Sequence, residues 1–458
     1  MAKRTVLVIG AGKSTSQLVN YFLDKSQEEN LEVVLGDISI ENAQKLVANH
    51  ANGIAIALDI FNKNQREEAI KKASIVVSML PARFHIEVAR DCVRHNKSMV
   101  TASYISNEMQ ALDQQVKEKG LVFMNEIGLD PGIDHMSAMQ VIDRIRDKGG
   151  KMMLFESFTG GLVAPESDTN LWNYKFTWNP RNVVLAGQGG AAEFIQEGSY
   201  KYIPYQRLFR RTEFLQVEGY GRFEGYANRN SLKYRSVYGL DDIPTLYRGT
   251  LRRVGFSKAW HIFVMMGMTD DSYQLQETEM MSYRDFVNLF LPYSPTDSVE
   301  LKLRHHVKID QDDVLWDKLI ELDIFNAQKK IGLKNATPAQ CLQRILEDKW
   351  TLAPEDKDMI VMYHKFGYEY KGQRKQIDAT MVSVGQDQIH TAMAKTVGLP
   401  VAIATLRILN KEITSPGVQL PITREVYEPI LKELEDYNII FKEYEVPYLG
   451  YNPDNVGG

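Results

Sequence analysis

The stretch TVLVIGAGKS, at residues 5–14, decides the fold class of this chain. Its first half, residues 5–9, is a continuous apolar and β-branched run, which is typical of a strand buried on both faces of a parallel sheet. The run ends at Gly10-Ala11-Gly12, and apolar residues at helical spacing follow over 14–23. A strand, a glycine-rich turn and a helix in this order predict the first βα unit of a dinucleotide-binding sheet.

The same alternation continues to about residue 126. Short apolar runs predict strands and helical patterns separate them, the strands being expected at 31–35, 54–58, 75–80, 98–102 and 121–126 and the helices at 64–72 and 86–95. Strands that alternate with helices form parallel sheets covered on both faces. The chain is therefore predicted to be an α/β protein that begins with a Rossmann-type doubly wound parallel sheet.

Beyond Pro131 the pattern changes to strand-like alternation of apolar and polar residues, at 152–158, 212–218 and 376–384. This predicts a second, mixed α+β domain with a mainly antiparallel sheet. The glycine-poor, charged segment 283–363 predicts a helical insertion, with candidate helix caps at Thr296 and Thr337. The expected domains are 1–130, then 131–282 with 364–389, the insertion 283–363, and C-terminal helices 390–458 that return to the first domain.

Length and charge exclude several classes of protein. A chain of 458 residues with a formal charge of -5 has no global basic field to hold nucleic acid. Its two cysteines make neither a disulfide framework nor a zinc site, so we expect no metal. The start of the chain lacks the apolar region of a signal peptide, and the apolar stretch 397–409 is interrupted by Pro400 and Arg407. We expect a cytoplasmic protein without membrane contact.

The glycine turn predicts the cofactor. Free backbone N–H groups and a helix N-terminus at Gly10-Ala11-Gly12 suit a pyrophosphate, although a plain tight turn has the same sequence. Asp37 ends the second predicted strand, where a carboxylate can bind the adenosine ribose and repel a 2′-phosphate, so NAD is favoured over NADP. An ordinary turn aspartate remains open, because Asp37 lies beyond the usual spacing of about 20 residues. Gly12-Lys13-Ser14 resembles the end of a P-loop, but Leu7 stands where that motif needs its first glycine.

Candidate chemistry lies in two further strings. NEIGLDPGIDH, at 125–135, ends the last predicted strand of the sheet, at the edge where ligands collect, and makes Asp130 a site candidate. A turn followed by a helix start explains the same string equally well. Arg229 and the string RGTLR at 248–252 supply guanidinium groups suited to carboxylates, although single arginines are more often solvated.

Taken together, these strings show that the chain resembles the saccharopine dehydrogenases of the glutamate-forming type over nearly its whole length. The residues that carry the resemblance are 10–12, Leu80-Pro81 with His85, 100–105, 128–135, 160–162, 174–176, 228–229, 248–252 and 392–400. The resemblance implies a Rossmann domain, a substrate and dimerisation domain with an inserted helical segment, and a homodimer. It also implies interconversion of saccharopine with L-glutamate and allysine, in which hydride passes between the secondary amine's carbon and the nicotinamide.

The resemblance further implies site residues. Ser103, Tyr104 and Asp130 should border both substrate and nicotinamide, while Arg229 and the segment Thr250, Leu251 and Arg252 should hold substrate carboxylates. The cofactor contacts that we expect are Gly10, Ala11, Gly12, Asp37, Ile38, Leu80, Pro81, Ala102, Ser103, Leu129, Asp130 and Pro131.

The amine must lose a proton before hydride leaves, so a base is needed within hydrogen-bond reach. We assign that role to Asp130, with Tyr104 assisting. In one position the chain departs from the family: Thr159 stands where relatives often have a cysteine, and a hydroxyl cannot replace a thiol as an acid or base. That cysteine cannot be essential here.

Two other functions remain open on sequence. A carboxyspermidine-type dehydrogenase has the same fold and reduces a related imine, and a non-catalytic NAD-binding regulator could keep the same scaffold. The strings at 129–131 and 228–229 favour saccharopine as substrate, and the intact site residues argue against a regulator.

Overall fold

The computed structural model describes residues 3–450 and 456–457. The chain divides into two compact units, which are described separately below. Unit 1 comprises Met1–Lys151 and Met381–Lys442, and unit 2 comprises Met152–Thr380 and Glu443–Gly458.

Unit 1 is built on a seven-stranded sheet in the order β15-β6-β5-β4-β1-β2-β3, all of whose strand pairs are parallel. Its strands are β1 (Arg4–Ile9), β2 (Leu31–Asp37), β3 (Gly53–Ala57), β4 (Ile75–Ser78), β5 (Ser98–Val100), β6 (Val122–Met124) and β15 (Gly417–Gln419). The predicted doubly wound sheet is confirmed. Strand β15 was not predicted, because it comes from the C-terminal part of the chain and joins the sheet only by pairing with β6.

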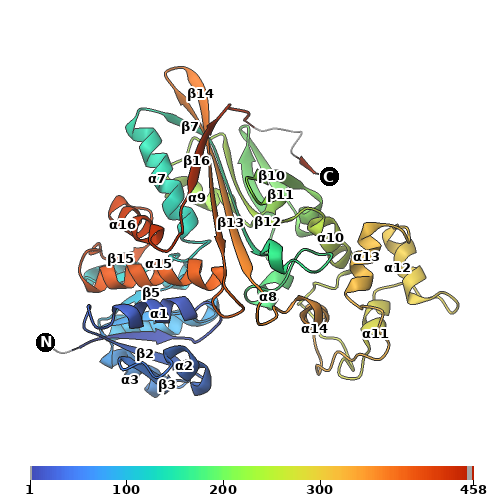
Figure 1. The fold of residues 1–458 in the computed structure, drawn as a ribbon, viewed down its shortest axis with the longest axis horizontal. Helices are drawn as coiled ribbons and strands as arrows, with labels where there is room; N and C mark the ends of the chain where they lie inside the picture. The colour runs from blue at the N-terminus through green and yellow to red at the C-terminus, as the bar shows by residue number, and fades with distance from the viewer. Residues whose placement is uncertain (1–2, 451–455, 458) are drawn as a thin grey trace. The chain divides into compact units, whose positions relative to one another are not determined.

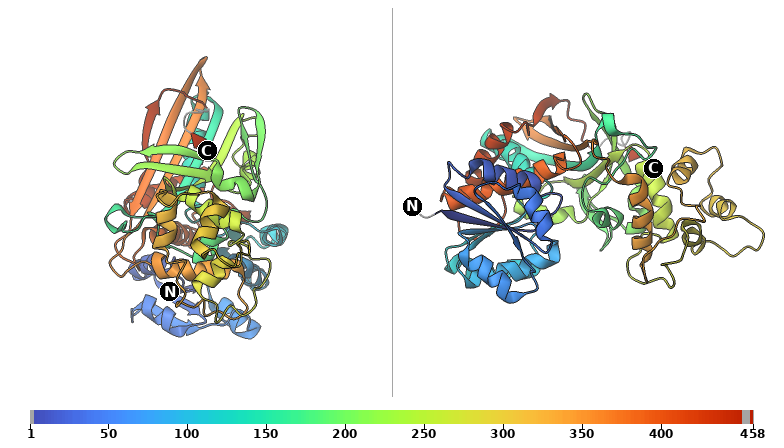
Figure 2. Two further views of the ribbon diagram at one scale, coloured as in Figure 1. Left: turned by 90° about the vertical axis from the view of Figure 1, so that its right-hand side faces the viewer. Right: turned by 60° about the horizontal axis from the view of Figure 1, so that its bottom comes forward.

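Helices cover both faces of this sheet (Figure 2, right). The helices of unit 1 are α1 (Ser16–Lys25), α2 (Ile40–Val47), α3 (Lys63–Lys72), α4 (His85–Arg94), α5 (Asn107–Gln110), α6 (Asp113–Glu118), α7 (Ile133–Asp147), α15 (Ala392–Leu409) and α16 (Arg424–Glu435). One face packs α3 and α4 onto the sheet through a core that includes Leu7, Ile70, Val88 and Cys92. Because β1 lies between β4 and β2, the strand order reverses at β1, and doubly wound sheets bind their ligands at the carboxyl ends of the strands at such a switch point.

Helix α15 belongs to the interior of unit 1. Thr391 caps it by accepting a hydrogen bond from the Ala394 amide at 2.9 Å. Gly398 lets it approach α1 closely, since a Cβ there would lie 2.9 Å from the Leu18 amide nitrogen. The helix is long and apolar enough to cross a membrane by length and composition, but 78% of it is buried by the rest of the protein, as in the core helix of a soluble protein.

Unit 2 contains a ten-stranded mixed sheet in the order β16-β14-β13-β7-β12-β11-β10-β17, with β8 and β9 attached beside β12. The long strands β7, β13 and β14 are visible in Figure 1. The strands are β7 (Lys151–Val163), β8 (Ala192–Gln196), β9 (Ser199–Ile203), β10 (Thr212–Val217), β11 (Gly221–Ala227), β12 (Thr245–Arg253), β13 (Asp358–Tyr370), β14 (Gln373–Val384), β16 (Lys442–Val446) and β17 (Val456–Gly457). The pair β12–β7 is parallel, whereas β10–β11 and β11–β12 are antiparallel.

The helices of unit 2 are α8 (Pro180–Val184), α9 (Tyr234–Val237), α10 (Phe256–Met266), α11 (Tyr283–Asn288), α12 (Val299–Val307), α13 (Val314–Glu321) and α14 (Pro338–Trp350). The last four gather together (Figure 1) and lie within the segment 283–363, for which the sequence predicts helices. Thr337 begins α14 through a capping box with Gln340, as predicted.

Several predicted boundaries differ from the structure, and residues 131–151 and 381–389, which the sequence places in the second domain, belong to unit 1. Residues 358–363 belong to β13 rather than to the helical insertion, because a continuous apolar run suits a buried strand as well as a helix. Ser298, not Thr296, caps α12. The predicted C-terminal segment 390–458 is divided between the units. Residues 390–442 belong to unit 1, whereas residues 443–446 of β16 belong to unit 2.

Candidate active site

The glycine turn lies at the carboxyl end of β1, where the strand order of the unit 1 sheet reverses. Gly10 has a φ of +107°, and a Cβ on it would lie 2.8 Å from the Met79 carbonyl oxygen just after β4, so only glycine fits. Gly12 is different, because it is exposed and nothing lies within 4 Å of the position of a Cβ. The protein itself does not require a glycine there. The open space suits a group that approaches the backbone, as a pyrophosphate does.

Asp37 is bound to this turn. Its Oδ2 accepts a hydrogen bond from the Ala11 amide at 2.7 Å, and its Oδ1 accepts one from the Ser39 amide at 2.9 Å. The carboxylate forms no ion pair within the described residues. Its neighbour Ile38 is 79% exposed. An uncompensated carboxylate therefore stands beside the turn, where an adenosine ribose would lie in a dinucleotide-binding fold.

The loop after β5 carries Ser103 and Tyr104. Glu126 fixes this loop, since its Oε1 accepts a hydrogen bond from the Ile105 amide at 3.0 Å and its amide donates to the Ser103 carbonyl at 3.1 Å. The other oxygen of Glu126, Oε2, lies 3.0 Å from His135 Nε2. A buried carboxylate thus holds the segment on which two of the predicted site residues sit.

Tyr104 and Asp130 meet in unit 1. The Tyr104 hydroxyl donates to Asp130 Oδ1 at 3.3 Å, and both side chains are reached by solvent. Asp130 precedes a cis peptide bond to Pro131. The loop carrying Asp130 packs tightly at its glycines: a Cβ on Gly128 would lie 2.8 Å from Ala102 Cβ. These contacts bring the segments at 102–104 and 128–131 together at one end of the sheet.

His85 lies behind this loop. It begins α4 and is only 4% exposed. Its Nδ1 lies 2.8 Å from the Ser78 hydroxyl, and its Nε2 lies 2.6 Å from the Ser103 hydroxyl. Burial lowers its pKa from the usual 6.5 to about 4. The imidazole is therefore neutral at physiological pH.

In unit 2, the segment Thr250 to Arg252 lies on β12 next to the paired glycines of β7. Thr250 stands opposite Thr159 in the β12–β7 register. A Cβ on Gly160 would lie 2.8 Å from the carbonyl oxygen of Leu251, so glycine allows this close approach. The Leu251 side chain is fully buried, and the Thr159 hydroxyl is buried without a hydrogen-bond partner.

Arg252 is a buried guanidinium without an acidic partner among the described residues. It is 4% exposed, and its Nη1 donates to the Leu251 carbonyl at 2.8 Å while its Nε has no partner. Glu224 stands opposite it across β11 and β12, but both Glu224 oxygens accept from the amides of Gly255 and Ser257.

Three aromatic rings surround this guanidinium, those of Tyr174 at 4.9 Å, Tyr226 at 5.8 Å and Phe256 at 5.3 Å. Aromatic faces attract a cation, but they do not satisfy its N–H groups. Burying an unpaired charge is costly, and an incoming carboxylate would satisfy both the charge and the free N–H.

The other candidate arginines are placed differently. Arg229 lies in the loop after β11 and is exposed, and its carbonyl accepts from the Glu193 amide at 2.9 Å. Arg248 is 5% exposed, and its guanidinium lies 4.4 Å from the centre of the Tyr234 ring. Arg229 thus lies in the loop after β11, whereas Arg252 lies within β12.

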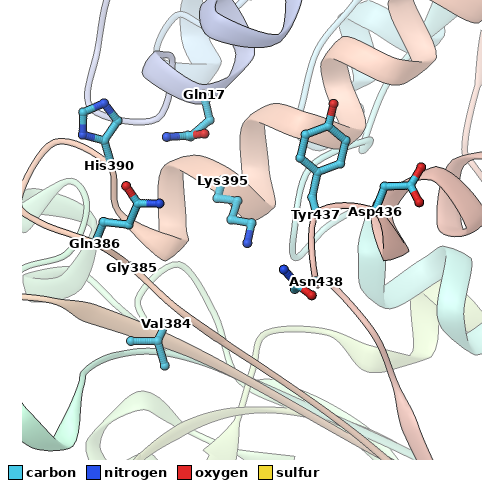
Figure 3. Close-up of a pocket in the computed structure, with 9 residues that line it drawn as sticks. All are labelled: Gln17, Val384, Gly385, Gln386, His390, Lys395, Asp436, Tyr437 and Asn438. Atoms are coloured by element: carbon cyan, nitrogen blue, oxygen red, sulfur yellow. The ribbon is translucent and has the colours of Figure 1, made fainter.

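Unit 1 has a pocket of about 260 Å³ that lies apart from the predicted site residues (Figure 3). It is lined by Gln17, Val384, Gly385, Gln386, His390, Lys395, Asp436, Tyr437 and Asn438. Burial lowers the pKa of Lys395, while His390 is paired with Asp387 at 3.0 Å. None of the predicted site residues lines this pocket, so it is not the candidate active site.

The sequence singled out most of the residues that the structure brings together in unit 1, but it missed the links between them. Glu126 and His85 had no assigned role, although both contact the loop of Ser103. The only signal for them was that each follows a strand of the sheet at the edge where ligands bind.

Comparisons with known proteins agree with this architecture. The family model "Saccharopine dehydrogenase NADP binding domain" matches residues 6–124, and "Saccharopine dehydrogenase C-terminal domain" matches residues 128–440. The chain is similar to saccharopine dehydrogenase [NADP(+), L-glutamate-forming] of Saccharomyces cerevisiae, with 32% identity over 97% of this chain and 99% of that protein. The Pyricularia oryzae enzyme of the same name is 31% identical, again over 97% and 99% of the two chains.

Two further relatives extend the comparison. The mitochondrial alpha-aminoadipic semialdehyde synthase of Mus musculus is 31% identical over 96% of this chain but only 47% of its own length. The solved apo structure of the Saccharomyces cerevisiae saccharopine dehydrogenase (L-Glu forming) superposes with a TM-score of 0.87 at 30% identity, covering 97% of this chain and all of that one. With both family models matched and this similarity extending over nearly the whole chain, the protein belongs to the saccharopine dehydrogenase family.

Proposed function

We propose that this protein is an oxidoreductase that interconverts saccharopine with L-glutamate and allysine, using a nicotinamide dinucleotide. The observation that carries the proposal is Arg252, a buried guanidinium in unit 2 with no acidic partner among the described residues. Saccharopine has three carboxylates, and each charge-assisted hydrogen bond to one of them contributes about 1.5 to 3 kcal/mol. The names of the similar enzymes support the same reaction.

The residues of the two units take different roles in this proposal. In unit 1 the turn at Gly10-Ala11-Gly12 holds the pyrophosphate, and Ile38, Leu80, Pro81, Ala102 and Leu129 contact the rest of the dinucleotide. In unit 2 Arg229, Thr250, Leu251 and Arg252 bind substrate carboxylates. The nicotinamide, when bound, would accept hydride from the carbon attached to the secondary amine, or donate hydride to that carbon in the reverse reaction.

Asp130 is the proposed general base. Its carboxylate takes the proton of the secondary amine, and the Tyr104 hydroxyl at 3.3 Å orients it. Ser103 lies on the same loop and binds the substrate or the nicotinamide amide. The amine thereby gains a lone pair that stabilises the developing imine as hydride leaves, and water then hydrolyses the imine.

Replacing Asp130 by asparagine should lower kcat for saccharopine oxidation by about 10²- to 10⁴-fold, because the amide keeps the shape but cannot accept the proton. The affinity for the dinucleotide should change little. Steady-state kinetics measure both quantities, and Tyr104→Phe, which removes only the orienting hydroxyl, serves as the comparison with a smaller expected loss. A kcat of Asp130→Asn within threefold of the wild type would assign the base elsewhere.

We propose that the chain prefers NAD, although the similar fungal enzymes carry NADP(+) in their names. The proposal rests on Asp37, whose uncompensated carboxylate accepts from the Ala11 amide. A ribose 2′-hydroxyl can donate to it, whereas a 2′-phosphate would be repelled. Glu41, which accepts from the Ser39 hydroxyl at 2.7 Å, adds a second negative charge at this end of β2.

Replacing Asp37 by alanine should therefore lower the ratio of kcat/KM for NAD to kcat/KM for NADP by at least about tenfold. This factor corresponds to a free-energy difference of about 1.4 kcal/mol. The measurement is the ratio of kcat/KM for the two cofactors at saturating saccharopine. Glu41→Ala removes a nearby charge without touching the glycine turn and should shift the ratio less. An unchanged ratio for Asp37→Ala would refute the proposed role.

We propose a homodimer, which the family resemblance implies, and we propose that it is located in the cytoplasm. Both cysteines, Cys92 and Cys341, are free and buried, which is compatible with a reducing compartment.

The experiment that tests the proposed function is incubation of the purified protein with saccharopine and NAD, and then with NADP, while the absorbance of the reduced cofactor is recorded. Reduction of either cofactor supports the proposal. If saccharopine leads to reduction of neither cofactor but a carboxyspermidine-type amine does, the protein would be assigned to the oxidation of that amine. Cofactor binding with no turnover of either amine would favour a non-catalytic regulator.

A further inference from the structure

The Ser103 hydroxyl is connected to the interior of unit 1 through one imidazole. His85 reaches from Ser78, the fully buried last residue of β4, to Ser103 on the loop after β5, with contacts of 2.8 and 2.6 Å. Thr101 directly follows β5. Its hydroxyl lies 3.5 Å from His85 Nε2 and accepts a hydrogen bond from the Ser103 amide at 3.3 Å. His85 thus contacts the Ser103 hydroxyl, while Thr101 contacts the Ser103 backbone amide.

The hydrogen-bonding neighbours of the His85 ring are hydroxyl groups, and His85 forms no ion pair with any residue that the structure describes. The groups that face its ring are Ser78 from β4, Thr101 after β5 and Ser103 from the following loop. On its own helix, the acidic Glu87 is engaged with Arg66 and Arg90. Burial is the cause of its lowered pKa, and no neighbouring charge contributes.

A neutral imidazole has one donor and one acceptor, so its two contacts are linked. When Nδ1 donates to Ser78, Nε2 accepts the Ser103 proton and leaves the Ser103 oxygen free to accept from a ligand. In the other tautomer Nε2 donates to Ser103, whose hydroxyl is then free to donate. In either case the ring fixes the Ser103 hydroxyl, and a protonated ring could only donate.

We infer that His85 is a positioning residue, a neutral imidazole that holds the Ser103 hydroxyl in place for the reaction without exchanging a proton with the substrate. The claim that His85 holds Ser103 for catalysis rests on the proposed function. The claim that the His85 ring is neutral does not depend on that function.

The catalytic part is tested with His85→Leu, which fills the space without hydrogen bonds, and His85→Gln, whose amide can donate and accept. His85→Leu should lower kcat for saccharopine by about tenfold to a hundredfold, while the dissociation constant of the dinucleotide, measured by protein fluorescence, changes less than threefold. His85→Gln should recover part of the loss. The pH profile of kcat/KM should keep the same apparent pKa values in wild type and variants, because a neutral ring does not titrate in the working range.

Two results would overturn this part. Loss of one limb of the pH profile in His85→Leu would make the residue an acid or base, and an unchanged kcat would remove it from the site. Ser78→Ala is the matched second variant, because it leaves the imidazole present but without its interior anchor. It should lower kcat in the same direction, by less than His85→Leu.

The charge of the ring is tested without any substrate. An unfolded histidine binds a proton near pH 6.5, whereas the buried ring takes one up only at about pH 4, so the wild-type protein should lose stability as the pH falls between these values. Denaturant unfolding at pH 7 and pH 4.5 should show a smaller loss of stability for His85→Leu than for wild type. An equal loss in both would overturn the neutral assignment. A wild-type protein inactive on saccharopine would contradict the proposed function and leave this result standing.

Discussion

Replacing Arg252 by leucine should lower kcat/KM for saccharopine by about a thousandfold. The side chain offers a buried fork to a carboxylate, and the loss of two charge-assisted bonds of about 2 kcal/mol each corresponds to that factor. The fold should survive, because leucine removes an unpaired buried charge from an aromatic surround. Steady-state kinetics with varied saccharopine measure the loss, and cofactor KM should stay nearly constant.

The chain offers a matched control for this prediction. Arg253 is the next residue of β12, and its Nη1 donates to the Tyr220 carbonyl at 2.7 Å with its guanidinium against the Phe223 ring. Successive residues of a strand point to opposite faces, so Arg253→Leu removes the same charge from the other side of the sheet. It should leave kcat/KM within a few-fold of wild type. Equal losses in the two variants, or no loss in Arg252→Leu, would remove Arg252 from the substrate site.

The glycine turn gives the second large effect, and it separates folding from binding. Gly10→Ala should destabilise the protein by about 2 to 4 kcal/mol, because alanine at positive φ is strained and its Cβ would press on the Met79 carbonyl. Gly12→Ala should change stability by no more than about 0.5 kcal/mol, since its Cβ would meet open space. The same added methyl group should raise the cofactor KM by at least about tenfold, as it obstructs the approach of the pyrophosphate to the backbone.

Denaturant unfolding and cofactor titration of the two glycine variants make this comparison. A stable Gly12→Ala protein with unchanged cofactor KM would mean that the turn at Gly10-Ala11-Gly12 does not hold the dinucleotide. A Gly12→Ala protein that unfolds like Gly10→Ala would mean that Gly12 is required by the fold itself.

Much of unit 1 was predictable because a strand buried on both faces leaves a continuous apolar run. Strand β15 was not, since Gly417–Gln419 is too short for any period and is defined only by its pairing with β6 far away in sequence. The start of β13 was misassigned for a related reason: the apolar run at 359–362 has no periodicity to separate strand from helix.

Among the site residues, too, some had a local sequence motif, whereas others depend on contacts between distant segments. Motifs identified the glycine turn, Asp130 and Arg252 as candidates, but sequence could not tell a buried arginine from a solvated one, because Tyr174 and Tyr226 come from distant segments. His85 could equally have been a simple helix-start residue. Its contacts with Ser78 and Ser103 arise from the parallel pairing of β4 and β5, which no local pattern encodes.

Identifying the products that the protein forms from saccharopine tests the proposed reaction directly. Chromatographic analysis of a reaction containing saccharopine and the preferred dinucleotide should yield L-glutamate in a one-to-one ratio with the reduced cofactor, together with allysine. Release of lysine in place of glutamate, or saccharopine that stays intact while no cofactor is reduced, would contradict the proposed reaction.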